Sequence, residues 1–85
     1  MPANLVASGN TYNPSLIVLR DKGYELWLEK AENGSLWCAR KNGHSFLAYS
    51  GPELLGVVTL WECLGDHWNQ QTPDVLGELF EKRDD

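Results

Sequence analysis

The chain has 85 residues, of which 42% are hydrophobic, and a net charge of −5. A chain this short forms one small domain that buries about 60–65% of its unfolded surface, so little core remains for an active-site cavity. It contains no apolar run near the ~20 residues of a membrane span and no signal-peptide pattern at its start, which predicts a soluble cytoplasmic protein with no membrane partner. Cys38 and Cys63 are expected to be separate thiols rather than a disulfide.

The acidic charge is concentrated in the C-terminal third. Residues 1–50 contain five basic and four acidic side chains, whereas residues 51–85 contain two basic and eight acidic ones. Between Lys41 and Lys82 there is no Lys or Arg. A surface built from this third would repel phosphate groups, so we expect no nucleic-acid partner.

The first regular element is expected after a flexible arm over residues 1–12. Asn13-Pro14 is typical of an N-cap followed by proline at the first helical position, and it predicts a short helix over about 14–22. The alternative is a strand, because the apolar run that follows is short and partly β-branched.

Three runs rich in strand-forming residues follow, at about 24–30, 35–40 and 44–49, separated by Asn33-Gly34 and Asn42-Gly43. Asn-Gly is the preferred pair for a two-residue type I′ hairpin turn, because both positions need a positive φ. The sequence therefore predicts a three-stranded antiparallel meander.

The two turns also predict a register and two sheet faces. If each Asn-Gly pair forms its turn, Ala39 pairs with Leu28 on one side and with Phe46 on the other. Alternation of side chains then places an apolar set on one face, which we expect to form the core. This set is Tyr24, Leu26, Leu28, Trp37, Ala39, Phe46 and Ala48.

The clearest helix signature lies at 51–64. Ser50 is a good N-cap, Glu53 completes a capping box, and Gly65 is a natural left-handed stop. One helix face is apolar along its whole length, and we expect it to pack on the core face of the sheet. We expect a flanking face to be covered as well, and it consists of Gly56, Leu60 and Cys63. The remaining face is expected to meet water, and it consists of Leu55, Thr59 and Glu62.

A second, weaker helix is predicted at about 73–82. Thr72-Pro73 repeats the cap-plus-proline signature, and a short apolar stripe follows it. The predicted fold class is therefore α+β: a short N-terminal helix, a three-stranded antiparallel meander, a core helix and a short C-terminal helix. All of these elements belong to a single domain over residues 13–83.

Residue types that could support catalysis are few and scattered. Cys38 is expected mid-strand, His44 beside a turn and His67 in the link between the last two helices, none of them next to a glycine-rich or oxyanion-forming segment. Glu62 and Asp66 lie near His67 but lack the paired Cys or His spacing of zinc sites. We therefore expect no enzyme activity, no metal and no cofactor; the alternative is a small enzyme with a site near His67.

The strongest functional signal is aromatic. Trp27 is expected on the outer sheet face, opposite the core, with Arg40 placed to stack on its ring. An apolar patch with a charged border is typical of protein-interaction surfaces. The alternative is that the N-terminal arm or the C-terminal helix covers this face. The expected patch consists of Trp27, Leu36, Arg40, Leu47 and Tyr49.

The order helix, three-stranded meander, helix is similar in topology to double-stranded-RNA-binding domains. That resemblance implies basic side chains at the start of the helix after the sheet, where they would contact phosphates. Here that helix begins Gly51-Pro52-Glu53 and contains no Lys or Arg. The leading hypothesis is therefore a non-enzymatic protein-interaction or regulatory module of bacterial size, which binds a protein partner or itself. RNA binding is the alternative.

Overall fold

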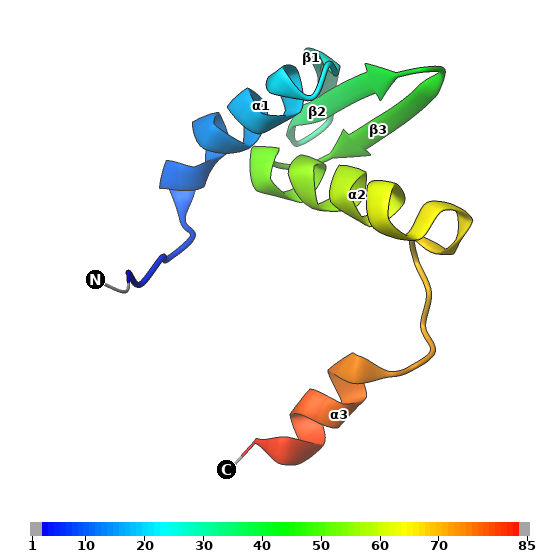
Figure 1. Cartoon of the computed structure of the whole chain (residues 1–85). Coiled ribbons are helices and arrows are strands. Elements are labelled where there is room, and N and C mark those ends of the chain that lie inside the picture. Colours follow the sequence, from blue (N-terminus) through cyan, green and yellow to red (C-terminus); the bar gives the residue numbers. More distant parts are fainter. Residues whose placement is uncertain (1–2, 84–85) are drawn as a thin grey trace.

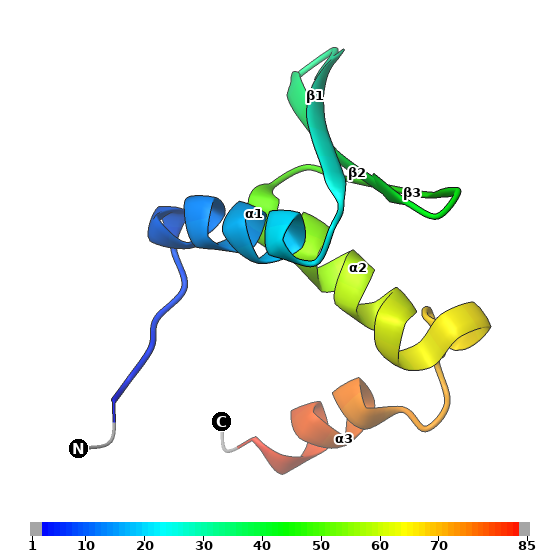
Figure 2. The same cartoon turned by 45° about the horizontal axis from the view of Figure 1, so that its top comes forward.

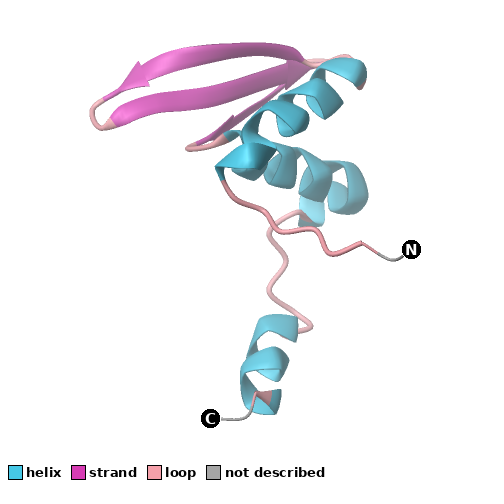
Figure 3. Ribbon diagram, turned by 90° about the vertical axis from the view of Figure 1, so that its left-hand side faces the viewer, coloured by secondary structure: helices cyan, strands magenta, loops and turns pink. Residues whose placement is uncertain are grey.

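The computed structural model describes residues 3–83 and has the predicted α+β fold. Two helices, α1 and α2, lie on one side of a three-stranded antiparallel sheet, and a third helix, α3, lies apart from both (Figures 1 and 3). The strand order is β1-β2-β3, so β1 and β3 are the edges of the sheet. The elements are η1 (Gly9–Thr11), α1 (Tyr12–Asp21), β1 (Glu25–Ala31), β2 (Gly34–Lys41), β3 (His44–Ala48), α2 (Gly51–Leu64), η2 (Gly65–His67) and α3 (Val75–Lys82), where η denotes a 3₁₀ turn.

The first long element is a helix, not a strand, and it begins earlier than predicted. Because α1 starts at Tyr12, Pro14 lies in its first turn, where the missing amide hydrogen costs nothing. The cap residue is Thr11 rather than Asn13, and its side chain makes no cap hydrogen bond. The turn η1 and the first residue of α1 therefore lie inside the segment expected to be an arm.

The second hairpin has the predicted turn and register. Asn42 and Gly43 have φ values of 52° and 83°, and this pair of positive values is what a type I′ turn requires. Ala39 pairs with Phe46, as predicted. This hairpin connects the central strand to the edge strand β3.

The first hairpin is shifted by two residues from the predicted register. Its turn lies at residues 32–33 instead of Asn33-Gly34, and Leu28 pairs with Trp37. Gly34 has a positive φ of 131°, but it is the first residue of β2 rather than a turn residue. Because strand side chains alternate with a period of two, a shift of two leaves each side chain on its predicted face. The prediction of the core face is therefore confirmed, although the predicted register is wrong.

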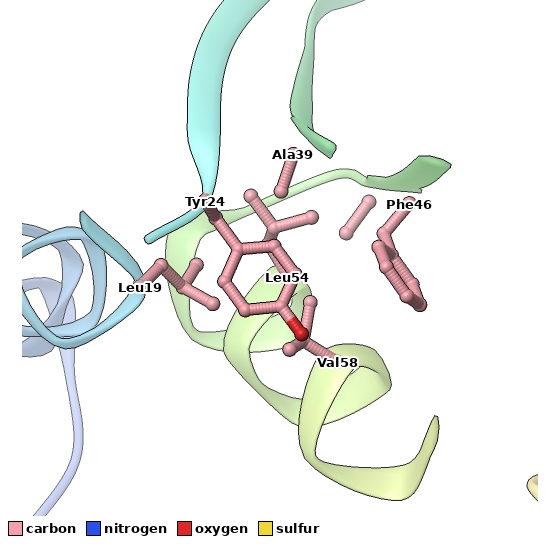
Figure 4. Close-up of a cluster of buried hydrophobic side chains, with 7 residues drawn as sticks. Leu19, Tyr24, Ala39, Phe46, Leu54 and Val58 are labelled. Atoms are coloured by element: carbon pink, nitrogen blue, oxygen red, sulfur yellow. The ribbon is translucent and has the colours of Figure 1, made fainter. Parts of the chain in front are cut away.

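The core is small and lies where α1 and α2 meet the sheet (Figure 4). Tyr24 and Phe46 close it from the sheet side, with ring centroids 6.0 Å apart in an edge-to-face arrangement. The elements α1, β2 and α2 each contribute at least one core side chain that is at most 1% exposed. These side chains are Leu19, Ala39, Leu54 and Val58.

The β1–β2 hairpin reaches past the helices, and this exposes part of the predicted core face (Figure 2). Leu28 lies on that face but is 57% exposed. Tyr24 and Ala39, nearer the base of the hairpin, are buried. The length of the hairpin relative to α1 and α2, rather than the side-chain pattern, sets where the core ends.

Both ends of α2 lie at the predicted residues, although the ψ of Gly65, −129°, is outside the left-handed helical region expected for a helix stop. The Ser50 hydroxyl accepts a hydrogen bond from the Glu53 amide at 3.2 Å. Gly65 follows the last residue of the helix with a φ of 59°. These two residues fix the length of the helix that carries most of the core.

The flanks of α2 differ from the prediction in part: Thr59 is exposed as expected, but Leu55 and Glu62 on the same flank are partly covered. α1 packs on the flank that carries Leu55 and Glu62, which was expected to meet water, and Glu62 accepts a hydrogen bond from Lys22 at 3.0 Å. Leu60 and Cys63, which were expected to be covered, are exposed. Helical spacing determines which residues share a flank, but the direction of the preceding chain determines which flank a neighbour covers.

α3 begins two residues later than predicted and has a different cap. The Asp74 carboxylate accepts a hydrogen bond from the Gly77 amide at 2.9 Å, so Pro73 lies before the helix. None of the residues of α3 is buried. The Cα radius of gyration is 15.3 Å, whereas a compact domain of 85 residues has about 12 Å. The chain is therefore extended, and the separated α3 contributes to that extension (Figure 3).

Candidate interaction surfaces

The sheet face that points away from α1 and α2 carries the residues of the predicted patch (Figure 3). Trp27, Cys38 and Leu47 form one row across the three strands. Arg40 and Leu36 flank this row on β2, two residues to either side of Cys38. Among residues 3–83, neither the N-terminal segment nor α3 lies over this face (Figures 2 and 3).

Among the apolar residues of the patch, the most exposed ones lie at β3 rather than at Trp27. Tyr49, which directly follows β3, is 76% exposed, and Leu47 is 53% exposed. Trp27 and Leu36 are half-buried. A partner approaching the outer face would therefore meet the Tyr49 ring first.

Trp27 and Arg40 stack as predicted. The Arg40 guanidinium carbon lies 5.4 Å from the centre of the Trp27 ring. Arg40 also forms an ion pair with Glu25, its direct cross-strand neighbour. This pair is exposed, so it contributes little to stability and instead fixes where the guanidinium lies beside the patch.

Cys38 lies in the middle of the outer face but is fully buried. Its thiol donates a hydrogen bond to the Glu29 carboxylate, with Sγ and Oε2 3.2 Å apart. Burial, together with the negative charge of Glu29, raises the pKa of the Cys38 thiol to about 11. The thiol is therefore neutral at pH 7, and a neutral thiol is a poor nucleophile.

The two cysteines are expected to differ in reactivity. Cys63 is exposed, whereas Cys38 is buried and protonated. A thiol reagent at pH 7.5 should therefore modify one cysteine per folded chain rapidly and the second only after unfolding. Mass spectrometry of the digested product identifies which cysteine reacted. Rapid modification of Cys38 in the folded chain would contradict this expectation, and Cys63→Ser supplies the control in which no rapid phase should remain.

A second apolar surface lies between β3 and the exposed flank of α2, and we call it the β3–α2 groove. Its volume is about 360 Å³. Leu60 and Leu64, both exposed, extend its apolar surface along α2. The sequence pattern did not predict this groove, because Val57 and Trp61 belong to the apolar stripe of α2 that was expected to pack on the sheet. The signal that could have indicated it is Leu60, an apolar residue outside that stripe. The groove is lined by His44, Ser45, Phe46, Leu47, Val57, Trp61 and Trp68.

A polar cluster joins the ends of α1 and α2 on the other flank. The Glu62 carboxylate accepts hydrogen bonds from Lys22 Nζ at 3.0 Å and from the Tyr24 hydroxyl at 2.9 Å. These two bonds lower the pKa of Glu62. Burial and the Glu62 carboxylate raise the pKa of Tyr24 to about 12. The Lys41 ammonium lies 5.2 Å from the centre of the Tyr24 ring, and it donates a hydrogen bond to the Lys22 carbonyl at 2.6 Å.

This cluster predicts a pH dependence of stability. Because the pKa of Glu62 is lower in the folded chain, its contribution is fully present above the unfolded value of about 4.3 and is lost as the pH falls through the folded value. Glu62→Gln is therefore expected to lower the free energy of unfolding by about 1 kcal/mol at pH 7 and by progressively less below pH ~4.3. Urea unfolding of both chains at pH 7, 5, 4 and 3 measures this difference. A difference that stays constant with pH would contradict the assignment.

Other residues considered for chemistry are not brought together. His67 is exposed, and the structure places its side chain in no hydrogen bond, ion pair or ring contact within residues 3–83. The His44 ring instead stacks on Trp61, with centroids 4.6 Å apart, at the rim of the β3–α2 groove. In the same range no three His, Cys, Asp or Glu side chains are close enough to hold a metal ion. No helix there combines the length and apolar content that crossing a bilayer requires.

Comparison of the chain with protein-family models, with curated proteins and with solved structures finds no match.

Proposed function

We propose that this chain is a non-enzymatic protein-interaction module that binds a partner protein through the outer face of its sheet. The observation that carries the proposal is the exposure of Tyr49 and Leu47 on a face that no helix among residues 3–83 covers. Single exposed apolar residues are common on protein surfaces, but here they adjoin the half-buried Trp27 and Leu36. Aromatic and apolar side chains gathered in this way resemble the centre of a protein-protein interface.

The surroundings of the patch favour a particular kind of partner. Arg40 and Glu25 form an exposed ion pair beside Trp27, and Glu29 lies on the same face. A partner with an apolar centre and charges of both signs at its rim would complement this arrangement. The acidic C-terminal third adds a long-range attraction for a basic partner.

RNA binding has less support, although the topology is similar. α2 follows the sheet but begins with Pro52 and Glu53 and contains no basic residue. Duplex RNA is recognised largely through its phosphates and 2′-hydroxyls, so a helix without basic side chains lacks the groups for this contact.

Tyr49→Ala tests the proposed function. An aromatic anchor at the centre of an interface contributes enough that its truncation should raise the dissociation constant at least ~10-fold. Tyr49 is 76% exposed, so the free energy of unfolding should change by less than about 0.5 kcal/mol. A partner captured from the native cell on the immobilised chain and then purified is titrated against both chains by calorimetry.

Val18→Ala is the matched control, because Val18 is also an exposed apolar residue but lies on α1, across the sheet from the patch. It should bind the captured partner as tightly as the unmodified chain. The proposal fails if Tyr49→Ala binds equally well, or if Val18→Ala is impaired to the same degree.

A further inference from the structure

The apolar stripe of α3 is largely exposed, and none of its residues joins the core formed by the rest of residues 3–83. Its members are between 54% and 65% exposed, which is unusual for four large apolar side chains on one helix face. The ring contact found for Phe80 is local, with the Arg83 guanidinium carbon 5.1 Å from its centre. An isolated helix of eight residues is marginal in water, so packing must supply its stability. The stripe consists of Val75, Leu76, Leu79 and Phe80.

The chain as a whole exposes more surface than a compact monomer does. Its accessible surface is 6959 Å², whereas a folded monomer of this mass, 9.6 kDa, exposes about 5,100 Å². The excess is larger than the ~800 Å² that each partner contributes to a protein interface of standard size. The surface needed for a stable association is therefore present in one copy of this chain.

The β3–α2 groove offers a complementary site for a short helix. α2 has α1 packed on one flank, and the other flank, with Leu60 and Leu64, is uncovered. Two tryptophans, Trp61 and Trp68, line the groove on this side. An amphipathic helix binds such a groove by inserting side chains spaced three and four residues apart, and Val75, Leu76, Leu79 and Phe80 have this spacing.

The segment between η2 and α3 leads α3 away from β3 and α2, the two elements between which the groove lies (Figures 1 and 2). Local hydrogen bonds hold this segment in its extended path. The Gln70 amide donates to the His67 carbonyl at 3.0 Å, the Gln70 side chain donates to the Thr72 carbonyl, and the Gln71 side chain donates to the Asn69 carbonyl at 2.8 Å. A helix presented in this way is available to a neighbouring molecule.

We propose that α3 of one copy docks in the β3–α2 groove of a second copy, and that the second copy returns its α3 to the first. Such an exchange has two-fold symmetry and closes on itself, so it yields a dimer and not a chain of molecules. If each stripe residue and its site in the groove lose about 100 Å² apiece, the two contacts together bury roughly 1,600 Å², the standard size of a specific interface. The occupant of the groove is thus a second copy of this chain.

Sedimentation equilibrium of the full chain tests the proposal. At about 100 µM the mass should be twice 9.6 kDa and should fall toward the monomer mass on dilution. Leu79→Gln removes a central stripe residue and should raise the dimer dissociation constant at least ~100-fold, because both contacts are lost at once. Glu81→Gln introduces the same side chain on the opposite face of α3 and should leave dimerisation unchanged. Circular dichroism checks that each variant keeps its fold. We expect that it does, because the substituted side chains are exposed and lie outside the core.

Mixing two defective variants separates exchange from folding back. Trp68→Ala removes an exposed side chain that lines the groove but keeps an intact α3, whereas Leu79→Gln damages α3 but keeps an intact groove. A mixture can form one intact contact between unlike chains, with both substitutions in the other contact. Because the first substitution already disrupts that contact, the second adds little further loss, and the mixture should associate more tightly than either variant alone. If α3 instead binds the groove of its own chain, no such rescue occurs.

Three results would overturn the proposal. These are a monomer at every concentration, a dimer that Leu79→Gln does not weaken, and a mixture that associates no better than its components. The proposal does not rest on the function assigned to the outer sheet face, although Leu47 borders both surfaces. Tyr49→Ala should therefore leave dimerisation intact, and Leu79→Gln should leave the captured partner's affinity intact.

Discussion

Replacing Leu54 by alanine is expected to lower the free energy of unfolding by about 3 kcal/mol. Leu54 is 1% exposed and lies in the centre of the core, where α1, α2 and the sheet meet (Figure 4). The truncation removes apolar contacts and leaves a cavity that the surrounding elements can fill only by moving closer together. A domain of this size has a total stability of about 4–13 kcal/mol, so the loss would be a large part of it.

Leu28→Ala provides the matched control. Leu28 carries the same side chain and lies on the same face of the sheet as the core, but it is 57% exposed. Its truncation is expected to cost less than about 1 kcal/mol. Urea unfolding followed by tryptophan fluorescence, at a chain concentration low enough to avoid association, measures both values. Equal losses for the two variants would mean that the core extends along the β1–β2 hairpin.

Replacing Asn42-Gly43 by Ala-Ala is expected to lower the free energy of unfolding by about 2–3 kcal/mol. Both residues have positive φ values, 52° and 83°. Alanine in this region places its Cβ too close to the following carbonyl oxygen, at a cost of about 1–2 kcal/mol per residue. Asparagine and glycine tolerate the conformation better than other residues, so the native pair avoids most of this cost.

The same double change in the first hairpin should have little effect. Glu32 and Asn33 form that turn, and neither has a positive φ. Glu32→Ala with Asn33→Ala should therefore change the free energy of unfolding by less than about 0.5 kcal/mol. Thermal unfolding of the two double variants side by side makes the comparison. A larger loss in the first hairpin would show that Asn33, despite its φ, holds the turn.

The two hairpins show what a local motif can predict. Both contain Asn-Gly, yet only Asn42-Gly43 forms the two-residue turn. In the first hairpin the same dipeptide is displaced by one position, and Gly34 enters the strand with a φ of 131°. The sheet faces were nevertheless predicted correctly, because the register error was an even number of residues. For assigning side chains to the two sheet faces, the alternating pattern of apolar residues was thus a better guide than the Asn-Gly turn motif.

The candidate surfaces were predictable in part. Trp27 and Arg40 were expected to stack on an outer face, and they do, because alternation along the strands is a local property. The β3–α2 groove was not predicted, because it depends on which flank of α2 receives α1. The hydrogen bonds from Lys22 and Tyr24 to Glu62 belong to that same packing choice, since they join residues about forty positions apart in the chain.

The sequence by itself determined the elements, their order and the core face, since caps, turns and apolar periodicity act over only a few residues. Ser50 and Gly65 set the ends of α2 in this way. Only the tertiary structure decided how the helices are placed. α1 packs on the flank of α2 that bears Glu62, and the opposite flank of α2 is left apolar and open. α3 contributes no side chain to the core. These outcomes depend on the lengths and directions of the segments between elements, which no local pattern encodes.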